Sequence, residues 1–283
     1  MVKIIADSTC DLSQELLKRF NIATIPLHIL LGEEEFEDGV SLLPDDIYRW
    51  ADEHKTTPKT SAPSVDTVMQ VFRPALSAGE DIVCFSISES MSTSANVMRL
   101  AAMQMDAENR VHVIDSANLS TGIGLLVLEA AQMAADGKTA EEIVAEIERL
   151  KPMVRASFVV DTLTYLHRGG RCSGLEAMAG SVLKLHPKIV VSEGKMSSSK
   201  KYRGKIASVI MMYVRDMEEQ LLAADRKRVF ITHSGCPEDT IAQVKEYLQS
   251  LSHFEEILVT RAGGVISSHC GPGTLGVLFI AGE

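Results

Sequence analysis

The chain has 283 residues, 46% of them hydrophobic and 23% charged, and its net charge is −10. This length is about twice that of a typical single domain, and the composition is that of a globular protein with a sizeable core, so we expect two domains. The acidic balance excludes the usual nucleic-acid-binding protein, because phosphate backbones are bound by basic surfaces.

The cysteines and the hydropathy pattern narrow the class further. Five cysteines lie between Cys10 and Cys270 without a CxxC motif, so we expect neither a disulfide framework nor a metal site, and a cytoplasmic location fits best. No stretch approaches the ~18 apolar residues of a membrane span, so no integral membrane segment is expected. The short apolar run at the N-terminus meets Asp7 at once and is typical of a first strand rather than a signal peptide.

The first half of the chain alternates short apolar runs with amphipathic helical segments. Strands are predicted at residues 2–6, 25–31, 82–87 and 111–114. Helix-start signals lie between them: Asp11 as a cap, Pro44 in a first turn, Ser64 as a cap, and Thr139 with Glu142 as a capping box. This βαβα order predicts an α/β fold with a Rossmann-like, mostly parallel sheet that helices cover on both faces.

After Lys151-Pro152 the pattern changes to hairpins mixed with helices. Strands are predicted at 156–160, 188–192, 195–199, 229–232, 257–261, 265–268 and 275–281, and helices at 173–185, 205–222 and 237–251. The richest basic stretch, 195–205, holds five Lys or Arg residues, and we interpret it as a solvated hairpin. We therefore predict a C-terminal α+β domain with a mixed sheet, with domains at residues 1–152 and 153–283.

Several predicted strands run directly into small hydroxyl, acidic or histidine residues. These strand ends are Asp7-Ser8-Thr9, the serine-rich stretch 86–94, Asp115-Ser116, His233-Ser234 and Ser268-His269. Ligands bind at the carboxyl ends of strands in open α/β sheets, so a polar site is expected if these ends converge. Helix capping explains each case singly just as well, and we favour that structural role for Asp7 and Asp115.

Two hydroxyl clusters and one glycine motif are candidate binding segments. Ser92-Thr93-Ser94 precedes a helical stretch whose free N–H groups favour an anion, and Thr60-Ser61 offers a second hydroxyl pair between prolines. On local evidence alone, an ordinary proline turn that leads into a capped helix is the favoured interpretation of the second pair. The segment 271–276 matches G-x-G-x-x-G but precedes a strand, so we interpret it as a tight turn that fixes His269 rather than a dinucleotide site.

Taken together, these motifs resemble those of the DegV family of bacterial lipid-binding proteins. The matching blocks are the opening D-S-T-x-D-L at 7–12, the T-S-x-P-S block at 60–64, the serine block at 91–94, D-S-x-x-x-S at 115–120, Y-L-x-x-G-G-R at 165–171 and H-x-G-P-G-T at 269–274. Their order spans nearly the whole chain. Three departures stand out: Thr93 replaces a glycine beside the head-group site, His186-Pro187-Lys188 replaces Lys-Pro-apolar, and Cys270 follows His269.

The resemblance implies a long-chain fatty acid bound between the two domains, with no cofactor. Its carboxylate would be held by Ser and Thr hydroxyls and a histidine, and the candidate residues are Thr60, Ser61, Ser92, Thr93, His269 and Gly271. The resemblance further implies a partner, the ATP-binding subunit of fatty acid kinase, which phosphorylates the bound carboxylate. Arg171 would then lie near the docking or phosphotransfer surface, and the chain would have no catalytic residue of its own. Burying ~14 methylenes at ~0.8 kcal/mol each is worth about 10 kcal/mol, so the tunnel can supply the affinity.

Three alternatives remain at this stage. Ser92 and His269 could serve as nucleophile and base of a stand-alone hydrolase or acyltransferase on lipid esters, although no nucleophile-elbow motif accompanies them. A DNA-binding regulator conflicts with the net charge. A binding protein for another amphiphile, such as an isoprenoid acid or a lysolipid, fits the same residues.

Overall fold

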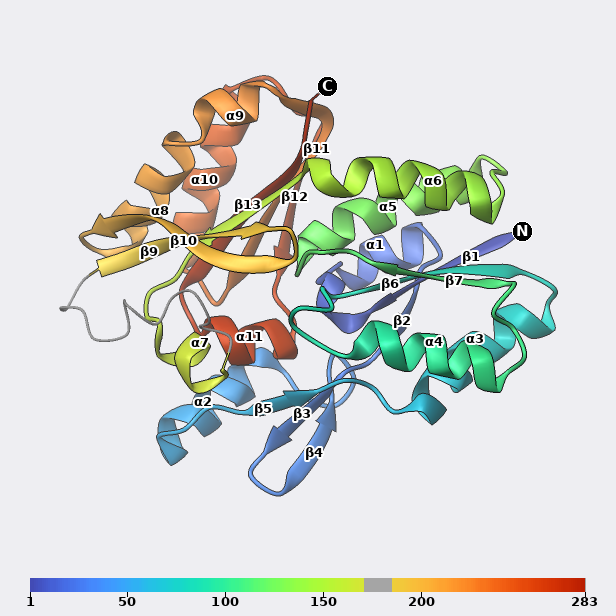
Figure 1. The fold of residues 1–283 in the computed structure, drawn as a ribbon. Helices are drawn as coiled ribbons and strands as arrows, with labels where there is room; N and C mark the ends of the chain where they lie inside the picture. The colour runs from blue at the N-terminus through green and yellow to red at the C-terminus, as the bar shows by residue number, and fades with distance from the viewer. Residues whose placement is uncertain (171–184, 283) are drawn as a thin grey trace.

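The computed structural model describes residues 1–170 and 185–282, whose strands form three sheets (Figure 1). The first is a four-stranded parallel sheet in the order β2-β1-β6-β7. Its strands are β1 (Val2–Asp7), β2 (Ala23–Ile25), β6 (Asp81–Ser86) and β7 (Val111–Asp115). The helices that flank it are α1 (Gln14–Arg19), α3 (Val65–Ser77), α4 (Ser94–Gln104), α5 (Thr121–Ala135) and α6 (Ala140–Leu150).

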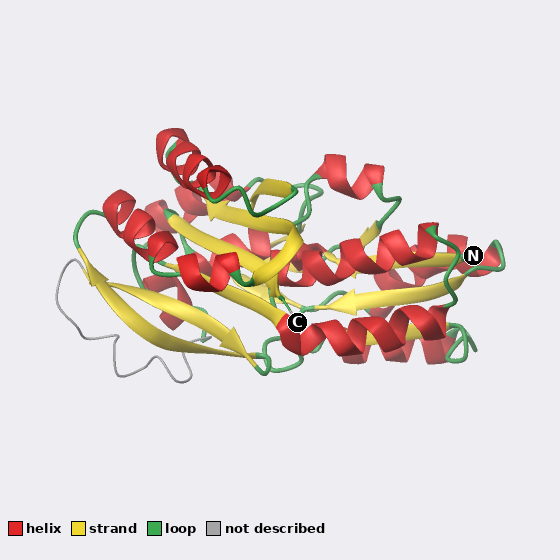
Figure 2. Cartoon of the chain, turned by 90° about the horizontal axis from the view of Figure 1, so that it is seen from above, coloured by secondary structure: helices red, strands yellow, loops and turns green. Residues whose placement is uncertain are grey.

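Helices cover both faces of this sheet because successive residues of each strand point to opposite sides. Ile5 packs with residues of α3 and α4 on one face. Its neighbours Ile4 and Ala6 pack with α1, α5 and α6 on the other. Figure 2, a view turned by 90°, shows the two helical layers on either side of the parallel strands. The predicted Rossmann-like sheet is therefore confirmed.

The second sheet has six strands in the order β10-β9-β8-β13-β11-β12. The strands are β8 (Val154–Val159), β9 (Leu185–Ser192), β10 (Lys195–Arg203), β11 (Ala224–Ser234), β12 (Glu256–Arg261) and β13 (Thr274–Ala281). Only the β11–β12 pair of this sheet is parallel, so the predicted mixed sheet is confirmed. Its outer face packs against α8 (Ile206–Arg215), α9 (Glu218–Leu222) and α10 (Glu238–Ser250).

Helix α5 lies between the two large sheets. It is buried and apolar over most of its surface, and it contacts β1 and β6 of one sheet and β8 and β13 of the other. A single hydrophobic cluster therefore runs through both halves, from Ile4 on β1 to Ile280 on β13. The buried Arg228 on β11 adds an ion pair to Glu129 on α5 at 2.6 Å.

The third sheet is a small antiparallel one, and the sequence did not predict it. It has the order β4-β3-β5, with β3 (His28–Leu31), β4 (Glu34–Glu37) and β5 (Lys59–Ser61), and α2 (Pro44–His54) lies beside it. Two short helices of the C-terminal half, α7 (Thr164–Arg168) and α11 (Gly264–Cys270), contact each other, and α11 also contacts α2, β3 and β5. The small sheet and α11 together form one side of the site described below.

Several expected elements differ in the structure. The predicted strand at 265–268 is wrong: these residues lie in α11. The predicted strand at 25–31 is wrong as one element, because Pro26 interrupts it and its two parts enter different sheets. Helix α1 is capped by Ser13, which accepts a hydrogen bond from Leu16 N, and not by Asp11. The predicted helix at 205–222 is two helices, with Asp216 at the break.

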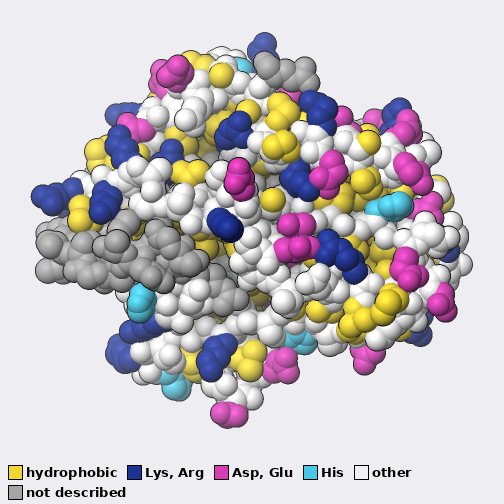
Figure 3. All heavy atoms as spheres, in the orientation of Figure 1, with side chains coloured by type: hydrophobic (Ala, Val, Ile, Leu, Met, Phe, Trp, Pro, Cys, Tyr) yellow, Lys and Arg dark blue, Asp and Glu magenta, His cyan; other side chains and the backbone are white. Residues whose placement is uncertain are grey.

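Other expectations are confirmed, and some stay untested. Pro44, Ser64 and the Thr139–Glu142 capping box start helices as predicted. The basic stretch 195–205 lies on β10 and the turn that follows it, and its Lys and Arg side chains are exposed. Lys and Arg side chains are spread over the face shown in Figure 3, interspersed with Asp and Glu. The predicted helix at 173–185 lies almost wholly outside the described residues. The domain boundary at 152–153 stays a prediction. No described helix combines the length and hydrophobicity needed to span a membrane.

Candidate functional site

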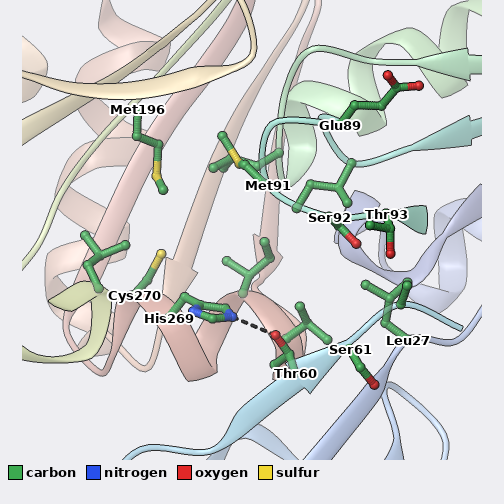
Figure 4. A pocket seen from close by; sticks show the side chains of 16 residues that line it. Leu27, Thr60, Ser61, Glu89, Met91, Ser92, Thr93, Met196, His269 and Cys270 are labelled. Carbon is green, nitrogen blue, oxygen red and sulfur yellow. Dashed lines mark hydrogen bonds between the residues drawn. The ribbon is translucent and has the colours of Figure 1, made fainter. Parts of the chain in front are cut away.

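A cavity of about 420 Å³ lies where the parallel sheet, the small sheet and α11 meet (Figure 4). Both halves of the chain contribute to its wall. The lining residues are Leu27, Thr60, Ser61, Ala62, Ile87, Glu89, Met91, Ser92, Thr93, Leu119, Leu166, Met196, Val265, Ile266, His269 and Cys270. Five of the six residues predicted to bind ligand, all except Gly271, are in this lining. A volume of this size is typical of small-molecule sites.

The polar end of the cavity is built around a hydrogen bond between the two halves. His269 Nε2 on α11 and Thr60 Oγ1 on β5 are 2.7 Å apart. The neighbouring residue Ser61 is also in the lining, but its hydroxyl points away from this pair in Figure 4, because consecutive strand residues face opposite sides. Of the two hydroxyls that the sequence offered here, Thr60 is therefore the one that joins His269.

Two glycines of the predicted motifs fit closely around this histidine. A Cβ on Gly169 would lie 2.3 Å from His269 Nδ1, so the first glycine of the G-G-R motif lets the chain pass against the imidazole ring. Gly271 has φ +72°, and a Cβ there would lie 2.6 Å from the Tyr165 ring. Gly271 thus ends α11 and contacts Tyr165 rather than lining the cavity. Arg171 lies outside the described residues.

The serine-rich segment forms a turn at the start of α4, on the opposite wall. Ser92 Oγ lies 2.8 Å from Ser94 Oγ and accepts a hydrogen bond from Ser94 N, which orders the turn. Thr93 occupies the N-cap position, but its side chain makes no capping hydrogen bond. Its exposed hydroxyl is therefore available as a donor at the cavity wall.

The β9–β10 hairpin contacts the segment that leads into this turn. Ser88 Oγ donates a hydrogen bond of 2.8 Å to the carbonyl of Gly194 at the hairpin tip. Gly194 has φ +75°, and a Cβ there would lie 2.5 Å from Ser88 Oγ, so the contact requires glycine. From the same hairpin, Met196 reaches the cavity wall opposite α11 (Figure 4).

At its other end, α11 is held by two buried carboxylates of the N-terminal half. Asp11 accepts hydrogen bonds from Gly263 N at 2.8 Å and from Ser120 Oγ at 2.5 Å. Asp38 accepts from Gly264 N at 2.7 Å and from Ser8 Oγ at 2.8 Å. These bonds satisfy N–H groups that no helical carbonyl can reach.

Burial changes the protonation of these aspartates. Desolvation by burial raises the pKa of Asp11 to about 8. The hydrogen bonds from Ser120 and Gly263 lower this pKa, but they do not offset the effect of burial. It raises the pKa of Asp38 as well. Asp7 nearby accepts from Ile87 N and from Thr9, and burial raises its pKa to about 6. The structural role favoured for Asp7 from the sequence agrees with these contacts.

The sequence missed the role of Asp11 and Asp38. Both lie in motif blocks, but a single carboxylate after a strand is most often a helix cap, which is how we interpreted Asp11. The feature of the sequence that could have indicated this role is the glycine pair at 263–264, because its N–H groups need hydrogen-bond acceptors. A Cβ on Gly264 would lie 2.9 Å from Asp38 Oδ1 and 2.5 Å from Ile29 Cδ1, so this close approach depends on glycine.

The chemistry of the site is that of an orienting pocket. Its polar side chains are hydroxyls, the His269 imidazole and the Glu89 carboxylate, which is paired with Arg99 at 2.5 Å, while most of the remaining wall is aliphatic or thioether. The hydroxyls and the imidazole can donate hydrogen bonds to an anion without adding a strong fixed charge. Within residues 1–170 and 185–282, no cluster of His, Cys, Asp and Glu is suited to hold a metal ion. The fold and cavity thus define an α/β protein with three sheets and an internal pocket whose lining is partly apolar and partly hydrogen-bonding.

Comparisons with known proteins identify the family. The family described as "Uncharacterised protein, DegV family" matches residues 1–282, and the chain belongs to it. A DegV domain-containing protein of Deinococcus radiodurans is 32% identical, over 98% of this chain and 97% of its own. A solved DegV family protein from Thermus thermophilus, described for its fatty acid binding, is 31% identical with a TM-score of 0.91 and 99% coverage of both chains.

A more distant solved structure shares the fold. It is the Fatty Acid Kinase (Fak) B3 protein of Streptococcus pneumoniae, loaded with linoleic acid. It is 22% identical, with a TM-score of 0.84 and 99% coverage of both chains, and at this identity the likeness concerns the fold alone.

Proposed function

We propose that this protein binds a long-chain fatty acid in the cavity between its halves and presents the carboxylate to an ATP-binding kinase subunit, which converts it to an acyl phosphate. The observation that carries the proposal is the cavity itself, which brings the hydroxyls of Ser92 and Thr93 to face the Thr60–His269 pair within a lining that is otherwise mostly apolar. The fatty acid binding described for the Thermus thermophilus relative supports the same ligand class.

In this proposal, the carboxylate lies between the Thr60–His269 pair and the Ser92-Thr93 turn. These groups come from opposite walls of the cavity, so together they can satisfy both carboxylate oxygens. A buried carboxylate is costly unless it accepts hydrogen bonds, and neutral donors supply them without neutralising its charge. An oxygen held in this way keeps the nucleophilic character that attack on a phosphoryl group requires.

The kinase partner is the finer part of the proposal. It rests on the family resemblance and on a site that has donors for a carboxylate but no residues arranged to bind a nucleotide: the G-x-G-x-x-G match at 271–276 leads into strand β13, not into a helix. Arg171 is proposed to contact the partner or the transferred phosphoryl group. A cytoplasmic location likewise stays a prediction.

The first test is native mass spectrometry of the purified protein, followed by organic extraction and lipid analysis. We expect a stoichiometric fatty acid, with a mass that returns to the apo value after delipidation and rises again on incubation with oleate. An apo protein whose mass is unchanged by saturated and unsaturated fatty acids would refute the ligand assignment.

The second test measures acyl phosphate formation with the kinase subunit, ATP and the loaded protein. Ser92→Ala and His269→Ala, each confirmed to be folded and loaded, should lose most of the activity, because the carboxylate loses its orienting donors. Ser64→Ala is a matched control, since Ser64 caps α3 and does not line the cavity. Full activity of both site variants would contradict the proposed role of these donors.

The hydrolase alternative is not favoured by the observed contacts. Ser92 Oγ is hydrogen-bonded to Ser94, and His269 Nε2 to Thr60, so the proposed nucleophile and base are each engaged elsewhere. Turnover of a nitrophenyl acyl ester by the wild-type protein, abolished by Ser92→Ala, would favour the hydrolase instead.

A further inference from the structure

A second, much smaller cavity lies behind the wall of the main one. Its volume is about 30 Å³, and it extends toward the six-stranded sheet. Its lining is Leu119, Ser120, Phe158, Thr232, His233, Ser234, Ala262, Ile266, Cys270, Thr274, Gly276 and Leu278. Leu119, Ile266 and Cys270 line both cavities, so these three side chains form the partition between them.

The partition is made of a few adjustable side chains rather than backbone. Ile266 and Cys270 are four residues apart on α11, one helical turn, and therefore lie on the same side of the helix. Leu119 comes from the segment just before α5. All three are buried and belong to the cluster that joins the two halves.

The small cavity is suited to apolar atoms although hydroxyls line it. The Thr232 hydroxyl bonds with those of Thr121 and Thr260, Ser234 Oγ donates to Gly271 O, and Thr274 Oγ1 donates to Cys270 O. Ser120 Oγ likewise donates a hydrogen bond to Asp11.

His233 Nδ1 is the exception: it is buried without a hydrogen-bond partner in the described part of the chain. A buried water needs about two to four polar partners. Because the side-chain hydroxyls of the lining already take part in hydrogen bonds within the protein and most of the lining surface is apolar, the small cavity suits a hydrocarbon end better than a water molecule.

We propose that the Leu119–Ile266–Cys270 partition is the chain-length stop, meaning that it limits the length of the acyl chain that the main cavity can hold. Smaller side chains in this partition should open the small cavity to additional carbons at the end of the chain. This inference rests on the proposed function, since it concerns how far the same fatty acid reaches. Each further methylene that becomes buried should raise the relative occupancy of the longer acid about fourfold.

The test compares fatty acids retained from an equimolar mixture of saturated straight chains of graded length. Cys270→Ala removes the sulfur from the partition and should shift retention toward longer chains by at least that factor per methylene. Ile266→Val removes one carbon from the same wall and should give a smaller shift in the same direction. If Cys270→Ala fails to fold, Ile266→Val still tests the proposal.

Two further variants isolate the mechanism. Cys84→Ala is the matched control, because Cys84 is also buried, on strand β6 of the parallel sheet, but lines neither cavity, so its profile should equal that of the wild type. Ala262 lines only the small cavity, so adding Ala262→Val to Cys270→Ala should cancel the shift.

The outcomes separate this inference from the proposed function. A wild-type protein that retains no fatty acid refutes the proposed function. A wild-type protein that retains fatty acid, with Cys270→Ala and Ile266→Val giving the same length profile, overturns the chain-length stop alone. An equal shift in Cys84→Ala would also overturn it, because the effect would then come from general loosening.

Discussion

The two ends of α11 are both held by the N-terminal half, but by different chemistry. At the start of the helix, the carboxylates of Asp11 and Asp38 accept hydrogen bonds from backbone N–H groups and lie buried. At its end, the His269 ring meets the Thr60 hydroxyl at the wall of a cavity. The first contact fixes where the helix lies, and the second leaves a side-chain pair facing a space that a ligand can enter.

Contacts that support stability and contacts proposed to support function therefore lie at opposite ends of α11, a helix of seven residues. The groups that anchor α11 are buried carboxyl groups that accept from backbone N–H groups, whereas the groups proposed to bind ligand are hydroxyls and an imidazole. The comparison predicts that substitutions at the start of α11 affect mainly folding, and that substitutions at its end affect mainly phosphoryl transfer. The predictions below test it in order of decreasing effect.

The largest effect is expected at the ligand end. Loss of one positioned donor typically costs a factor of about 100 or more in rate, so His269→Ala should lower acyl phosphate formation by about that factor. Thr60→Val keeps the shape of the side chain and removes its hydroxyl, and should act in the same direction. Both should change the free energy of unfolding by only about 1 kcal/mol, measured by urea denaturation. A stability loss without a rate loss would reverse the assignment of the two ends.

At the anchoring end, Asp38→Ala should lower the free energy of unfolding by about 1–3 kcal/mol, because Gly264 N would be left buried without an acceptor. Asp11→Ala should act similarly through Gly263 N. The exposed Asp136 provides the control, and Asp136→Ala should fall within about 0.5 kcal/mol of wild type. Equal stability of all three variants would show that α11 is held by packing alone.

The same carboxylate predicts how stability depends on pH. The pKa of Asp11 is raised in the folded protein to about 8 from an ordinary value of 3.8, so the folded state binds more protons than the unfolded state between these values. The stabilisation is present below about pH 4 and is lost as the pH rises through about 8. Asp7 acts in the same direction, up to about pH 6.

Urea titrations between pH 7 and pH 8 separate Asp11 from Asp7, because the Asp7 carboxyl is largely ionised above about pH 7. The wild type should lose stability across this range, and Asp11→Asn should lose clearly less. Parallel losses in the two proteins would show that another group is responsible.

The smallest effect is expected at Thr93, whose hydroxyl caps no helix. Thr93→Val should leave thermal stability nearly unchanged and weaken fatty acid binding about fivefold, the value of one hydrogen bond of about 1 kcal/mol. Titration of the delipidated protein with a fluorescent fatty acid measures this. Unchanged affinity would mean that Thr93 only narrows the entrance, and Thr93→Gly, which restores the family residue, would then raise the rate of binding.

Elements that are determined by residues close in sequence could be predicted, whereas elements that depend on distant residues could not. The parallel sheet and its helices follow from residue periodicity and local caps such as the Thr139–Glu142 box, and they were predicted correctly except for the bounds of β2 and the cap of α1. Helix α11 was not, because Val265 and Ile266 favour strands and its stability comes from carboxylates more than 200 residues away in sequence. The small sheet was missed for a similar reason: β3 and β5 are short and pair across the intervening α2.

The sequence by itself determined the family, the two large sheets and the residue types at the site, because motif spacing and hydrophobic period are written along the chain. It left open whether Thr60 or Ser61 meets His269, and whether Gly271 touches ligand or only shapes the turn. The tertiary structure shows that Thr60 meets His269, because alternate residues of β5 face opposite sides and Thr60 is on the side of α11. It also places Gly271 against Tyr165. The cavities and their partition also belong to tertiary structure alone, because side chains from distant segments enclose them and no local pattern specifies a shared void.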